Sequence, residues 1–217
     1  MRIDVSFPAS FYWAIYPRMN WVERRVALAG LGATLIGRRA RSAEPAGEVQ
    51  SVRGECYALT ADVRRSLATA AAVFIGDSVG TGPQSALALH LGEATNVRLG
   101  PEARLRIDRF IINAGGTLVL ERGAMLCEHD ARASGNEMNI LSPFGLIAVR
   151  GTSVWGGPSN GVFGVFVQRG AVTVTGRRKT VLVVSGFGTN IAYPGDEPTA
   201  PAPWGAARIK SALDSVM

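Results

Sequence analysis

Ser78 is the first residue in this sequence whose type and position could do chemistry, because it follows a Gly-Asp pair in a strand-like segment. A serine nucleophile needs a histidine base, which a carboxylate holds in place. Only two histidines are present, and the base pattern Asp-x-x-His is not met, since Leu126 stands three positions before His129. The pattern therefore favours a turn at residues 76–78, and no catalytic residue is predicted.

The segment Cys127-Glu128-His129-Asp130 groups side chains that can bind metal ions. Neighbouring residues cannot all close on one ion without help from distant ligands. A solvated loop is therefore the favoured interpretation, and neither a metal nor another cofactor is predicted. His90 is expected on the outer face of its strand.

Cys56 and Cys127 are the only cysteines. An oxidising compartment would allow a disulfide between them. The alternative is two separate, half-buried thiols. Since sequence alone cannot establish the pairing, both possibilities stay open.

Arg150-Gly151-Thr152, followed by Trp155, is the remaining candidate site. It interrupts an apolar β-type run, where a glycine usually marks a bulge or a close backbone approach. The donors of Arg150 could recognise a partner or an anionic ligand. Alternatively, Arg150 pairs with an internal carboxylate or backbone carbonyls and locks a bulge. Trp155 is expected to be a core residue rather than an exposed aromatic platform.

Short strands separated by Gly-containing turns are expected to position these residues. The pattern predicts an all-β fold, because long crossover helices are absent. We expect a single domain of many short strands, arranged as a twisted sandwich or roll, or as an irregular β-solenoid. Leu105 and Ile107 should point inward, whereas Arg104, Arg106 and Asp108 should point outward.

The end of the chain has a different pattern. Residues 193–217 begin as a Pro-rich tail, which is expected to pack on the domain through Trp204. Ile209, Leu213 and Val216 then follow at helical spacing, so one short C-terminal helix is predicted. The β-domain itself is predicted to cover residues 44–192.

Residues 1–43 are interpreted as an N-terminal extension plus a cleavable signal peptide that includes a signal helix. Arg24-Arg25 precedes a weakly apolar run at residues 26–37, and small residues around Ala43 fit a cleavage site. The run is too short to span a bilayer, which needs about 20 residues. A twin arginine before such a run favours twin-arginine export to the periplasm, whereas the alternative interpretation of the run is a buried amphipathic helix. The true start is expected at Met19, the alternative being an unusually long N-terminal region of the signal. No transmembrane helix is predicted in the mature chain.

The strongly basic pI of about 10.0 comes from the N-terminal segment. Residues 44–217 contain 16 basic and 15 acidic residues. A nucleic-acid-binding domain needs a basic patch on its folded surface, and the single basic run, Arg177-Arg178-Lys179, is expected in a hairpin turn. A nucleic-acid partner is therefore not predicted.

The order of several segments resembles the FecR-like domain, the periplasmic part of iron-dicitrate signalling regulators. The matching segments are Val52-Arg53-Gly54, Gly76-Asp77-Ser78-Val79 with Thr81 and Ser85-Ala86, Leu99-Gly100-Pro101-Glu102-Ala103, Ser142-Pro143-Phe144-Gly145, Val149-Arg150-Gly151-Thr152, Val165-Phe166-Val167, and residues 170–174 and 181–189. The resemblance covers residues 47–192. A different block, residues 74–79, resembles the nucleophile block of Gly-Asp-Ser-Leu esterases, but the other blocks of that family are missing.

The FecR resemblance implies an all-β domain outside the inner membrane that senses or relays rather than catalyses. Because proteins with different partners share the Arg-Gly-Thr motif, the structural interpretation of Arg150 is preferred. The leading hypothesis is an exported, non-enzymatic domain that binds a partner protein or an envelope component. The alternatives are an accessory of transmembrane signalling and, more remotely, an envelope esterase acting through Ser78. The oligomeric state stays open.

Overall fold

The computed structural model describes residues 45–111, 115–130 and 137–217. The chain divides into two compact units, Met1–Ala40 and Arg41–Met217, and the second unit is described below. The predicted extension, signal helix and cleavage site near Ala43 lie outside the described residues.

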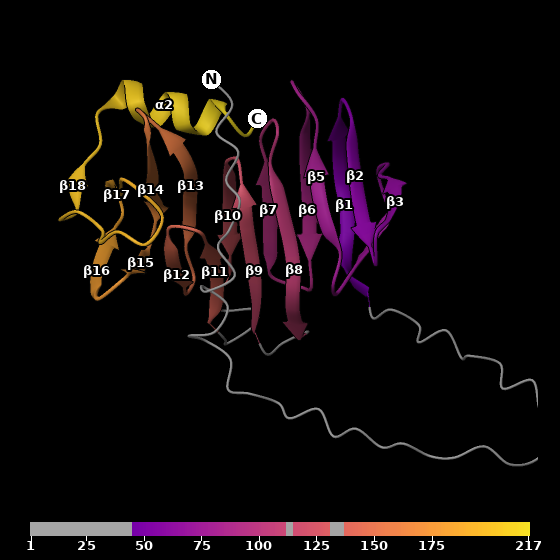
Figure 1. Ribbon diagram of the computed structural model, residues 1–217, viewed down its shortest axis with the longest axis horizontal. Coiled ribbons are helices and arrows are strands. Elements are labelled where there is room, and N and C mark those ends of the chain that lie inside the picture. Colours follow the sequence, from indigo (N-terminus) through magenta and orange to yellow (C-terminus); the bar gives the residue numbers. More distant parts are fainter. Residues whose placement is uncertain (1–44, 112–114, 131–136) are drawn as a thin grey trace, which may run out of the picture. The chain divides into compact units, whose positions relative to one another are not determined.

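Arg41–Met217 contains two nine-stranded sheets, which we call sheet A and sheet B (Figure 1). In spatial order, sheet A consists of β18 (Ala202–Pro203), β17 (Phe187–Ile191), β14 (Val162–Arg169), β13 (Ser153–Ser159), β10 (Met125–His129), β7 (Thr95–Leu99), β6 (Ala86–Leu91), β1 (Pro45–Arg53) and β4 (Ala72–Phe74). Sheet B consists of β16 (Lys179–Val184), β15 (Ala171–Gly176), β12 (Gly145–Val149), β11 (Met138–Ser142), β9 (Gly115–Arg122), β8 (Arg104–Ile111), β5 (Ser78–Thr81), β2 (Cys56–Thr60) and β3 (Val63–Ser66). The described strand pairs are antiparallel except for β9 with β11. The all-β prediction is confirmed.

The chain moves between the sheets as it runs along them. The hairpin β6–β7 lies in sheet A and β8–β9 in sheet B, and later β13–β14 lies in sheet A and β15–β16 in sheet B. Four of the segments that cross from one sheet to the other begin with an Arg-Gly pair. The glycines of these pairs, Gly54, Gly123, Gly151 and Gly170, have φ values of 73°, 82°, 65° and 84°. Glycine reaches this left-handed region without steric cost, so each pair lets the chain turn sharply from one layer to the other.

The core lies between the sheets, because side chains alternate along each strand. In β6, Leu87, Leu89 and Leu91 are at most 1 % exposed. In β8, Leu105 and Ile107 are fully buried while Arg104 and Arg106 lie on the other face, as the sequence predicted. One continuous cluster of buried residues extends from Ala46 to Ile191 and draws on both sheets.

A second, smaller cluster lies on the outer face of sheet A. There α2 (Ala206–Asp214) packs over β13 and β14 (Figure 1) and encloses Trp155, Phe166 and Trp204. The predicted C-terminal helix is thus present, and it belongs to the same compact unit as the strands. Within the described part of the chain, no helix is long and apolar enough to cross a membrane.

One local prediction needs correction. The apolar run around Arg150 is not one strand with a bulge, because β12 belongs to sheet B and β13 to sheet A. Alternation along a strand is local, but the sheet that a strand joins depends on distant partners.

Candidate functional site

Arg150, Gly151 and Thr152 form the crossing from β12 to β13. The crossing packs against another one, because a Cβ on Gly170 would lie 2.6 Å from Thr152 Cγ2 and 3.0 Å from the Gly151 carbonyl oxygen. The Thr152 carbonyl accepts the backbone N–H of His129 at 2.9 Å. Gly151 and Thr152 therefore have structural roles where two crossings meet.

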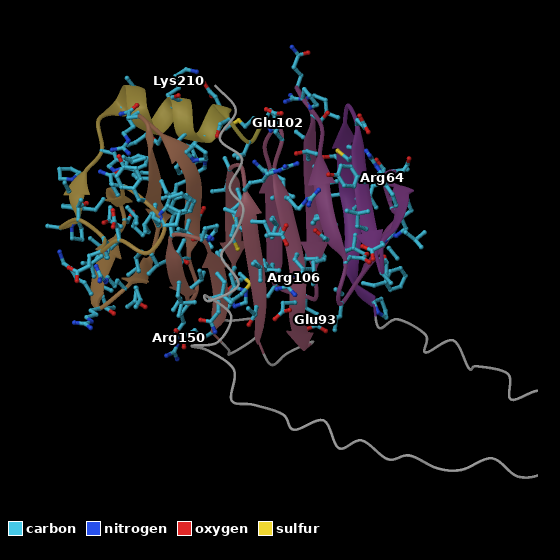
Figure 2. All side chains as sticks on the ribbon, in the orientation of Figure 1. Arg64, Glu93, Glu102, Arg106, Arg150 and Lys210 are labelled. Atoms are coloured by element: carbon cyan, nitrogen blue, oxygen red, sulfur yellow. The ribbon has the colours of Figure 1, made fainter. Side chains whose placement is uncertain are left out.

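Arg150 differs from its two neighbours in the crossing, because its side chain is exposed. Figure 2 shows it at the lower edge of the strands, pointing away from both sheets. Among the described residues no carboxylate pairs with it, so the carboxylate partner, one of the two structural alternatives for Arg150, is not found there. The guanidinium is instead available to a partner.

Trp155 is fully buried, in the cluster under α2. Its indole N–H donates to Ser215 Oγ at 3.3 Å, and its ring meets Trp204 edge-on with centroids 6.0 Å apart. The core position expected for Trp155 is therefore found, although the core is the outer cluster and not the space between the sheets. It cannot serve as an exposed aromatic platform.

Trp204 anchors the tail, as the sequence predicted. Its ring stacks on Phe166 with centroids 5.3 Å apart, and the Arg208 guanidinium lies over the ring, 3.5 Å from its centroid. Burial lowers the pKa of Arg208. Glycines in β14 and β17 make room for the ring, since a Cβ on Gly164 or Gly188 would come within 2.7 Å or 2.3 Å of it.

Asp77 is a structural residue whose role the sequence did not indicate beyond a turn. It is fully buried, and its carboxylate accepts the Phe74 backbone N–H at 3.0 Å, the Arg65 guanidinium at 2.5 Å and the Thr60 hydroxyl. A buried carboxylate is tolerated only when it is paired and hydrogen-bonded. Asp77 thus ties the β4–β5 turn to β2 and β3, and the Gly-Asp pair was the only sequence signal for it.

Ser78 and the two histidines lie in different sheets, so they do not form a catalytic set. Ser78 faces away from the core of sheet B, because its neighbour Val79 points into the core. His129 lies in sheet A, is only 3 % exposed and bonds to Thr95 Oγ1 at 2.9 Å. His90 faces outward from sheet A and bonds to Asn96 at 2.8 Å. The sheets themselves keep both imidazoles away from the Ser78 hydroxyl.

The predicted solvated loop at residues 127–130 is wrong for its first part. Cys127, Glu128 and His129 belong to β10, and His129 is buried beside Thr95 because β7 pairs with β10 along this stretch. Among the residues that the structure describes, no group of three or more His, Cys, Asp or Glu side chains could hold a metal ion.

The possible disulfide between Cys56 and Cys127 is not formed, since both are free, buried thiols. Cys56 Sγ lies 3.4 Å from the carbonyl oxygen of Ala86 at the start of β6. Cys127 is in β10, which lies two strands from β6 in sheet A. Strands are about 4.8 Å apart, so this separation approaches about 10 Å, whereas a disulfide needs Cα atoms within about 7 Å.

The outer face of sheet B forms a candidate interaction surface that the sequence did not indicate. One row of outward residues crosses all nine strands: Thr180, Thr175, Leu146, Leu141, Val119, Arg106, Ser78, Leu59 and Arg64. Its β16 end is neutral and its β3 end is charged (Figure 2 labels Arg64 and Arg106). Finding this row required the register of eight strand pairs.

The charges at the β3 end neutralise one another. Arg64 pairs with Glu55 and lies over the Tyr57 ring, 4.0 Å from its centroid. The Tyr57 hydroxyl accepts a bond from Arg104 at 3.4 Å, which is the main cause that raises the pKa of Arg104. Arg106 pairs with Asp108 at 2.8 Å. Paired arginines do not make the basic patch that nucleic acid requires.

This arrangement defines a class: a largely antiparallel two-sheet β-domain with Arg-Gly turns at crossings between the sheets. Residues 77–173, a little under half of the chain, match the family model described as FecR protein. The matched part runs from the buried Asp77 into β15 and includes the Arg150 crossing, so the FecR resemblance is confirmed over these residues.

Two solved structures have a similar fold. Both are crystal structures of a protein named a putative anti-sigma factor, from Parabacteroides distasonis, at 14% sequence identity. Their TM-scores are 0.53 and 0.54, and each match covers 63% of this chain. The match spans 64% and 63% of those proteins, a little under two thirds of their length. At this identity the likeness concerns the fold alone. No curated protein matches the sequence.

Proposed function

We propose that this chain is an exported, non-catalytic regulatory domain that binds a partner protein or an envelope component. The observation that carries this proposal is the FecR match over residues 77–173, which covers the centre of both sheets. FecR-type domains are regulatory parts of envelope signalling systems. The exposed Arg150, at the crossing inside this match, is the residue assigned to recognition.

The proposal that the domain is non-catalytic rests on the positions of Ser78 and the two histidines. Ser78 faces outward from sheet B, whereas His129 is enclosed at the inner face of sheet A and His90 faces outward from sheet A. A general base must come within hydrogen-bond reach of its nucleophile. Ser78 therefore has no histidine to activate it, and an esterase role is disfavoured.

The test is an affinity pull-down from the envelope fraction with the full chain, followed by mass spectrometry. Arg150→Ala is compared with Lys210→Ala, which removes another exposed cation, from α2 (Figure 2). Both variants should fold, as circular dichroism will show. We expect a specific partner that Arg150→Ala loses and Lys210→Ala retains. If both variants keep the partner, Arg150 has no role in recognition, and if no partner is captured, the binding proposal fails.

A second candidate function is that of an accessory to transmembrane signalling. The solved relatives named as anti-sigma factors favour it. The same pull-down distinguishes the two candidates: a membrane-bound sensor among the captured proteins supports signalling, whereas a soluble envelope component supports the first proposal.

The periplasmic location is part of the proposal and rests on the sequence of residues 1–43. Replacing Arg24 and Arg25 by lysine should retain the full-length chain in the cytoplasm, because the twin-arginine route requires both arginines. Replacing Arg38 and Arg39 by lysine should leave export and cleavage near Ala43 unchanged. Fractionation and intact mass measure both effects, and export of the first variant would argue for the general route.

A further inference from the structure

The four edge strands of the two sheets differ in how they are protected. Natural proteins block edge strands with short length, prolines or charges. In sheet A, β18 has two residues and includes Pro203, and β4 has three residues. In sheet B, β3 has four residues, among them Arg64 and Arg65. Each of these three edges carries at least one protective feature.

The fourth edge, β16, carries none of these features from residue 180 onward. It has six residues and, among the described strands, is hydrogen-bonded only to β15, at the end of sheet B (Figure 1). Residues 180–184 include neither proline nor a charge, and the pairing with β15 has no bulge. Leu182 and Val184 on its outer face are 60% and 42% exposed. Half of its backbone N–H and C=O groups point away from β15, and residues 180–184 make no further backbone hydrogen bond within the described part of the chain.

We propose that β16 is a self-association site, through which two copies of this chain pair their β16 strands antiparallel across a two-fold axis. The strand is self-complementary in this register. With Leu182 opposite its own copy, Thr180 faces Val184 of the second copy, and Val181 faces Val183. Each pair joins two even-numbered or two odd-numbered residues, and alternate residues of a strand point to the same face. Outward side chains therefore meet outward ones, and core side chains meet core ones.

The charges of β16 are compatible with this pairing. The basic residues Arg177, Arg178 and Lys179 all precede the apolar part of the strand. In the two-fold register Lys179 lies opposite Ser185 of the second copy, so no like charges face each other. The two basic turns lie at opposite ends of the paired strands, about 20 Å apart at about 3.4 Å per residue. The pairing joins two copies of sheet B into one continuous sheet.

The dimer should be reversible, because five paired β16 residues from each copy make an interface below the usual size of stable complexes. A closed two-fold contact also covers the exposed edge of both copies, so no further strand can pair at that site. The inference is independent of the proposed function, since a monomer could bind a partner equally well.

The first test measures self-association of the full chain by sedimentation velocity over a range of concentrations. The wild type should show a concentration-dependent dimer. Leu182→Lys and Leu182→Glu should each raise the dissociation constant about tenfold or more, because they place like charges on the two-fold axis. An equimolar mixture of the two variants should restore the dimer as a mixed species. Since Leu182 is largely exposed, both variants should keep the fold.

The second test fixes the register with a short thiol cross-linker. Leu182→Cys should cross-link to itself, because the two residues meet on the axis. Thr180→Cys should not, since its two copies would lie about 14 Å apart along the strands, but it should cross-link to Val184→Cys in a mixture. The native cysteines are buried and should not react. A monomer at all concentrations, an unaffected Leu182→Lys dimer, or equal cross-linking of Leu182→Cys and Thr180→Cys would each overturn the proposal.

Discussion

Single residues in this domain take their roles from neighbours far away in the chain. Trp155 is fully buried between β13 and α2, and it bonds to Ser215. We expect Trp155→Ala to lower the free energy of unfolding by about 3–5 kcal/mol, because it leaves a large cavity. Tyr193→Ala, at a position that is 72% exposed, should change it by less than about 0.5 kcal/mol. Urea unfolding followed by circular dichroism compares them, and equal effects would mean that Trp155 is not a packing residue.

The buried Cys127 thiol predicts a pH dependence of stability. Burial is the main cause that raises the pKa of Cys127 above its ordinary value of 9.0. Below that pH the thiol is protonated in both states and adds no pH dependence. Above it the unfolded thiol ionises while the folded one does not, so stability falls as pH rises, by about 1.4 kcal/mol at pH 10.

The comparison variant is Cys127→Ala, measured by urea unfolding at pH 8 and pH 10. It should be less stable at both pH values because a cavity is created, but it should lose less stability between them than the wild type. An equal loss in both proteins would show that Cys127 ionises in the folded state. In the same samples a thiol reagent should reach both cysteines only after unfolding, as expected of free, buried thiols.

Among the elements, α2 can be tested with two substitutions on opposite faces. Ala212 is buried against sheet A, whereas Ala207 is exposed in the first turn of the same helix. Ala212→Asp should release α2, because an unpaired carboxylate cannot remain in an apolar cluster. Ala207→Asp should be neutral or slightly stabilising, since a negative charge suits a helix N-terminus.

Tryptophan emission reports the outcome, because Trp155 and Trp204 lie under the helix. We expect a red shift for Ala212→Asp and none for Ala207→Asp, measured in the unit Arg41–Met217, which contains only these two tryptophans. An unshifted spectrum for Ala212→Asp would mean that the outer cluster does not depend on the helix.

For the whole unit, the shared core predicts a single unfolding transition. One cluster of buried residues connects the β1–β4 end to the β16–β17 end, so neither end should unfold alone. Circular dichroism averages over all strands, whereas tryptophan emission reports the end under α2. We expect the two urea transitions to coincide for Arg41–Met217. Tryptophan emission that changes at clearly lower urea would show that the α2 end unfolds independently.

The candidate site was only partly predictable. The segment Arg150-Gly151-Thr152 was identified because it breaks an apolar run, where a glycine usually marks a bulge or a close backbone approach. That the break is a crossing between sheets depends on its contact with Gly170, nearly twenty positions later. The buried state of His129 depends on Thr95 in another hairpin, and the free state of Cys127 depends on strand order. None of these partners is local in sequence.

The amino-acid sequence alone is enough to predict the short strands, their inward and outward faces, the C-terminal helix and the FecR resemblance, because all of these are periodic or contiguous patterns. The tertiary structure alone decided which sheet each strand joins, that α2 covers Trp155, and that β16 is the unprotected edge. The physical reason is that strand pairing and packing bring together residues that are far apart in the chain, and one strand does not specify its partner. The exposed position of Arg150 and the free edge of β16 are therefore visible only in the folded domain.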